Sequence, residues 1–318
     1  MKRNQMLFLL TLCLLICFSS SLSALVTIDY TYNVTSNTTI NDDVLITSNG
    51  IVQSSGWDYW LTVNGSITNE GIIRNDPVGY SLFVNVSGNI INNGTWSCRK
   101  TYLSGSSPKH ISCGSTNNFS SFYFYNNSEP NIIADSDLNF VGAQIDFQNN
   151  GSLDISSGYN LSISGGYLVR TTVIGETSCE LYMDNNAYLT DVIISDIILT
   201  GTTNIGSNIV TFQNNLINNN ILQNSGYNYD VHIEGDFTNN GTVRNNPGGY
   251  SLRVYVSGNA TNNGIWSCHF TYLNGSSQQH ISCGSTDNFS SLYFYNNNSQ
   301  NIIADSDLNF VGAQIDFQ

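Results

Sequence analysis

The chain has 318 residues, of which 10% are charged and 40% hydrophobic, and Asp and Glu outnumber Lys and Arg by 23 to 9. Its polarity is carried by Asn, Ser and Thr, while aromatic residues are frequent and Pro is rare, which excludes simple disorder and disfavours long helices. The net charge of -14 excludes nucleic acid as a partner, because clustered Lys and Arg are needed to neutralise phosphates. Arg99, Lys100 and Lys109 do cluster, and we interpret them as solvated surface.

The N-terminal residues have the pattern of a secretory signal peptide. Lys2 and Arg3 precede an apolar run over residues 7–18, and small residues follow as far as Ala24. The run is too short to span a membrane, and no later segment is apolar for about 18 residues. The sequence therefore predicts a signal peptide over 1–24, a secreted, extracellular or cell-surface location, and no membrane span in the mature chain.

A tandem duplication organises the mature chain. Residues 61–148 align without a gap to residues 231–318, and most positions are identical. We therefore divide the chain into a first repeat region over 25–148, a linking segment over 149–206 and a second copy over 207–318. The second copy stops in mid-repeat, so we expect it to be truncated and the protein to continue.

A shorter period of 21 to 23 residues runs inside each copy. The Asn-x-Gly turn at Asn69 recurs at Asn92, and the second copy repeats this interval between Asn239 and Asn262. Short strands with alternating apolar residues, such as 82–86, lie between the turns. This period suits one coil of a solenoid, so the sequence predicts an all-β fold, a right-handed parallel β-helix of tandem repeats with about 13 coils. A string of β-sandwich domains is the alternative.

The Gly and Asn residues of the turns are each expected to have a structural role. Gly is expected where the chain bends through positive φ, and Asn is expected to hydrogen-bond to its equivalents in adjacent coils.

Several segments resemble the repeat of large microbial surface proteins. They are the G-x-W strand at 94–96, the turn and strand at 102–112, the strands at 138–141 and 151–155, and the N-G-S-x-x-Q-x-I run at 274–281. The resemblance implies a parallel β-helical stalk of an adhesin-like protein. The paired cysteines of this chain depart from that pattern.

Five cysteines follow the signal peptide. Two pairs have the same spacing of 15 residues, and export makes disulfides chemically reasonable. The sequence therefore predicts one local disulfide in each copy, Cys98–Cys113 and Cys268–Cys283, with Cys179 left over. A metal site that includes His110 and His280 is the alternative, although three ligands per copy fall short of the four that structural zinc needs.

Carboxylate pairs are the best candidates for chemistry. Asp135 and Asp137 in the first copy, and Asp305 and Asp307 in the second, have the spacing that places two carboxylates on one strand face. We interpret them as polar turns, with a calcium site as the lesser alternative. No other cofactor is predicted, and no residue is assigned a catalytic role, because basic side chains are absent nearby in sequence.

Aromatic residues suggest an interaction surface. Trp57 and Trp60, with Tyr59, form a patch that could stack on sugar rings, although packing at a coil edge is the favoured interpretation. The run over 122–125 is apolar on both strand faces, so one face should fill the core and the other should meet a loop or a partner.

The sequence thus leads to one function hypothesis and one alternative. We predict an exported, non-catalytic cell-surface or secreted β-solenoid that acts as a structural stalk or an adhesin-like protein. Its partner would be a surface polysaccharide or a protein of a host or cell surface. The alternative is a carbohydrate-active β-helix that binds polysaccharide or cleaves it as a lyase or hydrolase.

Overall fold

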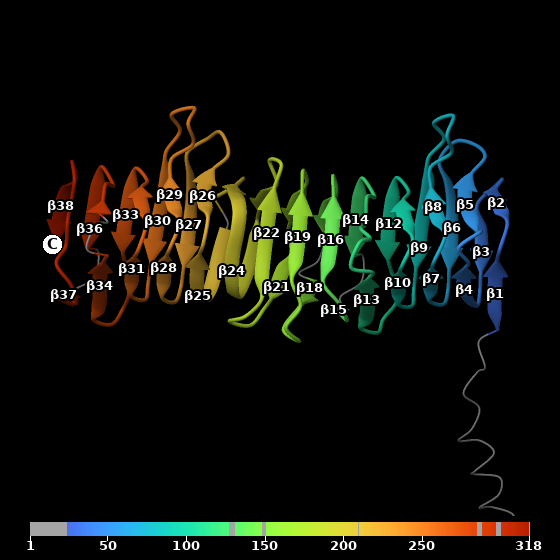
Figure 1. Cartoon of the computed structure of the whole chain (residues 1–318), viewed down its shortest axis with the longest axis horizontal. Coiled ribbons are helices and arrows are strands. Elements are labelled where there is room, and N and C mark those ends of the chain that lie inside the picture. Colours follow the sequence, from blue (N-terminus) through green and yellow to red (C-terminus); the bar gives the residue numbers. More distant parts are fainter. Residues whose placement is uncertain are drawn as a thin grey trace, which may run out of the picture.

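The computed structural model describes residues 24–126, 131–147, 151–208, 210–284, 288–296 and 300–317. Within these ranges the chain forms strands and turns without a helix, and it winds into a parallel β-solenoid of about 13 turns (Figure 1). This confirms the all-β solenoid fold and removes the β-sandwich alternative. The predicted signal peptide lies outside the described residues except for Ala24. No helix long and apolar enough to cross a membrane occurs in the described ranges.

Each coil contributes three short strands, and equivalent strands of successive coils pair into three parallel columns. Two longer strands, β24 (Val192–Ile205) and β25 (Val210–Asn218), bend from one column into the next. Column one contains parts of both, together with β1 (Leu25–Ile28), β4 (Asp43–Ile46), β7 (Ile67–Asn69), β10 (Ile90–Asn92), β13 (Lys109–Cys113), β15 (Ile132–Ala134), β18 (Ser152–Asp154), β21 (Thr172–Ile174), β27 (Tyr229–Ile233), β30 (Leu252–Val256), β33 (Phe270–Leu273), β36 (Tyr293–Asn296) and β38 (Gln314–Phe317).

The other two columns are built in the same way and also include parts of β24, and column two includes the second part of β25. Column two contains β2 (Thr31–Val34), β5 (Ile51–Ser54), β8 (Ile72–Arg74), β11 (Thr95–Ser97), β16 (Leu138–Val141), β19 (Leu161–Ser164), β22 (Glu180–Asp184), β28 (Phe237–Asn239), β31 (Ala260–Asn262), β34 (Gln279–Cys283) and β37 (Ile302–Ala304). Column three contains β3 (Thr38–Ile40), β6 (Tyr59–Val63), β9 (Leu82–Val86), β12 (Lys100–Leu103), β14 (Tyr123–Asn126), β17 (Gln144–Asp146), β20 (Tyr167–Val169), β23 (Tyr188–Thr190), β26 (Ile221–Asn224), β29 (Thr242–Arg244), β32 (Ile265–Ser267) and β35 (Asn288–Phe289).

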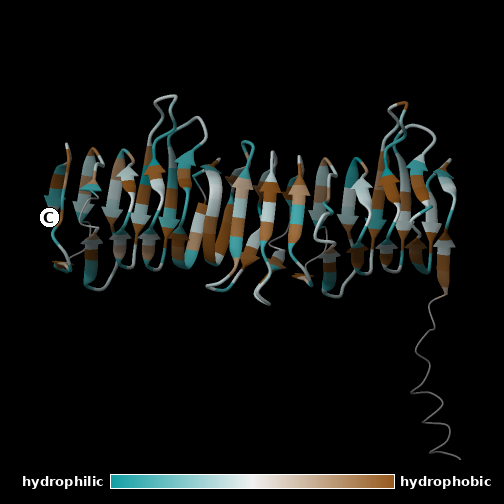
Figure 2. Cartoon of the chain, viewed as in Figure 1, coloured by the Kyte–Doolittle hydropathy of each residue, from teal (hydrophilic) through white to brown (hydrophobic). Residues whose placement is uncertain are grey.

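Strand alternation decides which side chains enter the core. In β30, Leu252, Val254 and Val256 are fully buried, whereas Arg253 and Tyr255 between them point outward and are partly exposed. Brown and teal bands alternate along the strands in Figure 2 for the same reason. Because each coil is only three strands wide, its inward residues pack on those of the coils above and below, and burying one Val or Leu side chain stabilises the stack by about 1.5–3 kcal/mol.

The second copy does not occupy the columns of the first. The strands β6, β9 and β12 lie in column three, whereas their equivalents β27, β30 and β33 lie in column one. The repeat therefore advances by whole coils plus one column. Column one lies low in Figure 1 at β4 and β7 but high at β27 and β30, so the columns twist along the stack. The twist of the columns offsets this shift by one column, so the projecting loops of the two copies lie on the same side of the stack.

The turn glycines are required for a reason that differs from the prediction. Gly71 and Gly94, in the Asn-x-Gly turns, are not among the residues with positive φ. A Cβ atom on Gly71 would lie 2.3 Å from the carbonyl oxygen of Gly50, and one on Gly94 would lie 2.2 Å from that of Gly71. These glycines therefore permit close approach of successive coils, and the expectation of positive φ is wrong at these turns.

The predicted asparagine ladder is confirmed. The side-chain amide of Asn69 donates to Asn92 at 2.9 Å in the first copy. In the second copy Asn218 donates to Asn239 and Asn239 donates to Asn262, both at 2.8 Å. All five residues are fully buried, so each amide satisfies the polar group of the next coil inside the core.

Candidate functional site

Two pairs of loops project from the same side of the stack, one pair in each copy (Figure 1). The first loop pair consists of residues 55–58, between β5 and β6, and residues 75–81, between β8 and β9. The second loop pair consists of residues 225–228 and 245–251. In each pair the two loops meet through aromatic rings: Trp57 and Tyr80 lie 5.4 Å apart, and Tyr227 and Tyr250 lie 5.7 Å apart.

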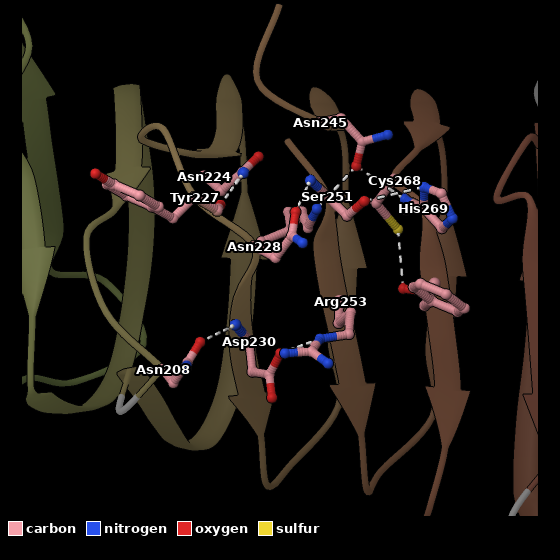
Figure 3. Close-up of polar contacts among 12 residues, drawn as sticks. Asn208, Asn224, Tyr227, Asn228, Asp230, Asn245, Ser251, Arg253, Cys268 and His269 are labelled. Carbon is pink, nitrogen blue, oxygen red and sulfur yellow. Dashed lines mark hydrogen bonds and ion pairs between the residues drawn. The ribbon is translucent and has the colours of Figure 1, made fainter. Parts of the chain in front are cut away.

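An asparagine anchors the longer loop of each pair. The side-chain oxygen of Asn75 accepts hydrogen bonds from the backbone N–H groups of Leu82 and Arg99, both at 2.9 Å. Asn245 makes the equivalent bonds to Leu252 at 2.8 Å and to His269 at 2.9 Å, and Figure 3 shows it between the two strands. The loops are thus tied to the next coil in both copies.

A groove lies beneath the first loop pair. It has a volume of about 380 Å³, and a second hollow of about 400 Å³ shares Gly79, Ser81 and Arg99 with it. We call the two together the first groove. Its wall is formed by Trp57 and Asp58 from the loop and by Lys100 and Tyr123 from column three, among others. The Trp57 side chain is 78% exposed, so its ring is open to a ligand.

The first groove is lined by two cations, Arg99 and Lys100, by several aromatic rings and by one carboxylate, Asp58. The Lys100 ammonium lies 5.0 Å from the centre of the Phe83 ring and 5.5 Å from that of Tyr123, within the range of cation–π contacts. Burial, followed by the nearby Tyr102, Tyr123 and Asp146, raises the pKa of Tyr125 to about 12. Its hydroxyl is therefore neutral near pH 7 and can donate a hydrogen bond.

The corresponding region of the second copy is chemically different. Phe270 stands in the place of Lys100 and stacks on Tyr293 at 4.9 Å. His269 stands in the place of Arg99, and its Nδ1 lies 3.0 Å from the Ser251 hydroxyl. Arg253 is paired with Asp230, as Figure 3 shows. The second loop pair therefore lacks the available cations of the first.

Trp60 does not line the first groove with Trp57. It points outward from β6 and packs on Phe83 and Tyr102, both at 5.1 Å between ring centres. It begins a row of aromatic side chains along column three that continues from Tyr102 to Tyr125 at 5.0 Å. The structure thus brings the two candidate sugar-stacking residues to neighbouring but separate places.

The predicted alternation over 122–125 is confirmed within β14 but not at Phe122, which precedes the strand. Phe124 is fully buried in the core, whereas Tyr123 and Tyr125 point outward and stack on each other at 5.4 Å. Phe122 is 57% exposed and lines the first groove.

The interpretation of Lys109 as solvated surface is wrong. Its side chain is 1% exposed, its ammonium donates to the carbonyl oxygen of Ser107, and burial lowers its pKa. In the second copy Gln279 takes the same position and donates to the carbonyl of Val256 at 3.0 Å. A long side chain with a terminal donor is what this corner requires.

The two carboxylates of the first pair, Asp135 and Asp137, contact different neighbouring coils. The Asp135 carboxylate lies 2.9 Å from Nδ1 of the His110 ring in the preceding coil. The Asp137 carboxylate instead accepts a hydrogen bond of 2.8 Å from the backbone N–H of Asn160 in the following coil. His280 and Asp305 repeat the first contact at 2.9 Å, and Asp307 is exposed. No group of three or more His, Cys, Asp and Glu placed to hold a metal occurs in the described ranges. Calcium binding stays a prediction.

The two predicted disulfides, Cys98–Cys113 and Cys268–Cys283, are wrong. No disulfide joins the cysteines among the described residues, and all five are buried. Cys98 lies at the corner between columns two and three, whereas Cys113 ends a strand of column one. In a solenoid the residues that stack are one coil apart, and the coil neighbour of Cys98 is Ser121, 23 residues later, at 3.3 Å.

A buried polar cluster therefore takes the place of the expected bridge. The Trp96 indole donates to Thr101 at 2.8 Å, and Thr101 lies 2.8 Å from Ser121. The second copy repeats the cluster through Trp266, Thr271, Cys268 and Ser291. The 23-residue spacing of Cys and Ser in both copies is the sequence signal that could have identified it.

Thiol labelling tests this correction. At about pH 8, iodoacetamide is expected to leave Cys98, Cys179 and Cys268 unmodified while the chain is folded, because burial raises the pKa of each thiol and only the thiolate reacts. After unfolding without a reductant, all three should become alkylated, as measured by peptide mass spectrometry. A disulfide-linked peptide containing Cys98 and Cys113 in the unreduced digest would contradict the structure.

No protein-family model matches this chain, and no curated protein or solved structure is similar enough to count as a match.

Proposed function

We propose that this protein is an exported, non-catalytic stalk of the adhesin-like kind that presents its loop pairs to partners outside the cell. The observation that supports this proposal most directly is the arrangement of the two loop pairs. They are separated along a continuous stack of coils and project to the same side (Figure 1). A rod that presents the same loop structure twice in one direction suits repeated contact with an extended partner.

The internal ladders support a role as a rigid spacer. Successive coils are joined by backbone hydrogen bonds in all three columns and by buried side-chain bonds such as the one between Asn239 and Asn262. Because each coil contacts its neighbours over its whole perimeter, bending the rod would break several bonds at once. Cleavage of polysaccharide remains the alternative hypothesis, and no contact described above favours it over binding.

Surface labelling of intact cells tests the proposal. An antibody raised against the purified chain is expected to label intact cells of the source organism or to detect the chain in the medium, with an intracellular enzyme as the control for lysis. The purified chain should release no new reducing ends or unsaturated products from a panel of neutral and acidic polysaccharides. Labelling that requires permeabilised cells would contradict export, and sustained product release would favour the enzyme alternative.

A further inference from the structure

We propose that the first groove binds an acidic polysaccharide, with Arg99 and Lys100 pairing with the carboxylates of uronate units and Trp57 stacking on a sugar ring. This inference rests on the proposed function in that it names the partner of one loop pair. The second loop pair would not share this ligand, because its cation positions are occupied by other groups.

The two cations of the first groove differ from the other described cationic side chains in having no acceptor in the protein. Most described cationic side chains already donate to an acceptor of the protein: Arg74 and Arg244 donate to glutamines, Arg170 and Arg253 pair with aspartates, and Lys109 donates to a carbonyl group. Within the described ranges, Arg99 and Lys100 are the two whose side chains have no hydrogen bond or ion pair. Both line the first groove. In a chain of net charge -14, two adjacent cations without a protein acceptor indicate an anionic ligand.

The aromatic wall identifies a saccharide rather than a small anion. An indole or phenol face packs against the C–H groups of a pyranose ring while the ring hydroxyls remain in water. Trp57 stands at the rim with its ring held edge-on to Tyr80 at an interplanar angle of 65°, so the position of its face is defined. Phe122 and Tyr123 also line the first groove and add apolar surface beside Arg99.

The geometry of the stack favours an extended chain. Phe83, Lys100 and Tyr123 are register partners in three successive coils, so their side chains repeat about every 4.8 Å. An extended chain that runs along the stack would meet these side chains one after another. Within one coil, the planar guanidinium of Arg99 matches a carboxylate, and the adjacent Lys100 ammonium adds a point charge beside it. Asp58, also in the wall, is placed to accept hydrogen bonds from sugar hydroxyls.

The second copy provides a matched control within the same chain. Arg99→His combined with Lys100→Phe introduces the residues that the second copy carries at these positions, so the coil is known to accept them. The charge control is Arg74→Gln combined with Arg244→Gln, which removes the same two charges from outside the first groove. Circular dichroism and thermal unfolding would check that each variant keeps the fold.

The experiment measures binding of the purified chain to polygalacturonate, alginate and hyaluronate, with methyl-esterified polygalacturonate as the uncharged counterpart and single-stranded DNA as the competing polyanion. Binding to at least one uronate polymer is expected, weakened by added salt. The groove double variant should weaken it by about tenfold to a hundredfold, whereas the charge control should change it less than about threefold. Trp57→Ala should weaken binding to the charged and the esterified polymer alike.

Three outcomes would overturn the inference: no binding to any of the three uronate polymers, equal loss in the groove variant and the charge control, or tighter binding to DNA than to all of them. Because these measurements use the purified chain, they are independent of where the protein is located. Failure of surface labelling would therefore contradict export without affecting the groove, and failure of binding would leave the stalk proposal standing.

Discussion

Asn239→Leu is expected to destabilise the second copy by about 2–3 kcal/mol, because it breaks a buried ladder on both sides. The Asn239 side chain is fully buried, accepts from Asn218 and donates to Asn262, both at 2.8 Å, and also donates to the carbonyl of Ile265 at 3.0 Å. Leucine has a similar volume but no polar atoms, so it leaves the partner amides in the neighbouring coils with fewer bonds in an apolar core.

The neighbouring residue supplies the control for this prediction. Asn240 makes a parallel ladder on the exposed side of the turn, to Asn219 at 2.9 Å and to Asn263 at 3.0 Å. Asn240→Ala should cost less than about 0.5 kcal/mol, because water can replace its bonds. Urea unfolding measures the change in the free energy of unfolding for each variant. In Asn239→Leu, hydrogen exchange should show a loss of protection centred on β28 and β31. Equal destabilisation by the two variants would show that burial does not set the strength of the ladder.

Arg170→Met is expected to lower the free energy of unfolding by about 2–3 kcal/mol. This loss is smaller than that caused by removing one partner of a fully buried ion pair, because the Arg170 guanidinium is partly in water. The Asp146 side chain is 1% exposed, whereas that of Arg170 is 54% exposed. Arg170 reaches back by one coil and makes two bonds to the carboxylate, one of them from Nε at 3.1 Å. Without Arg170, the buried carboxylate loses its cation and most of its hydrogen bonding.

A double variant separates charge from packing. Asp146→Asn combined with Arg170→Met removes the buried charge together with its partner, and most of the stability lost by the single variant should return. Thermal unfolding of the wild-type chain and of the single and double variants measures this difference. A double variant as unstable as Arg170→Met alone would instead assign the loss to contacts of the arginine side chain.

The sequence by itself was sufficient for the architecture. The alternation over 82–86, the Asn-x-Gly turns and their interval of 21 to 23 residues predicted a parallel solenoid and the stacking of Asn69 on Asn92, and the structure has both. These features can be predicted from the sequence because strands and turns depend on neighbouring residues, and because a regular period identifies the residues that lie one coil apart.

The candidate site depended on the tertiary structure, because the coil length varies where loops are inserted. Trp60 and Phe83, which are register partners, are 23 residues apart, whereas Phe83 and Lys100 are only 17 apart, since the long loop lies in one coil and not in the next. Sequence spacing therefore could not place Lys100 beside Phe83 and Tyr123 or bring Arg99 beneath the loop that carries Gly79.

The same reason explains why the predictions for the disulfides and for Lys109 were wrong. The 15-residue interval between Cys98 and Cys113 looked like a local loop closed by a bridge, but it spans less than one coil and separates two faces of the stack. Lys109 looked solvated because it lies near two other cations in the sequence, yet its strand turns it inward. The sequence alone determined the coil and its ladders; only the wrapping of the coils decided which side chains meet, because contacts across a solenoid depend on the length of each turn.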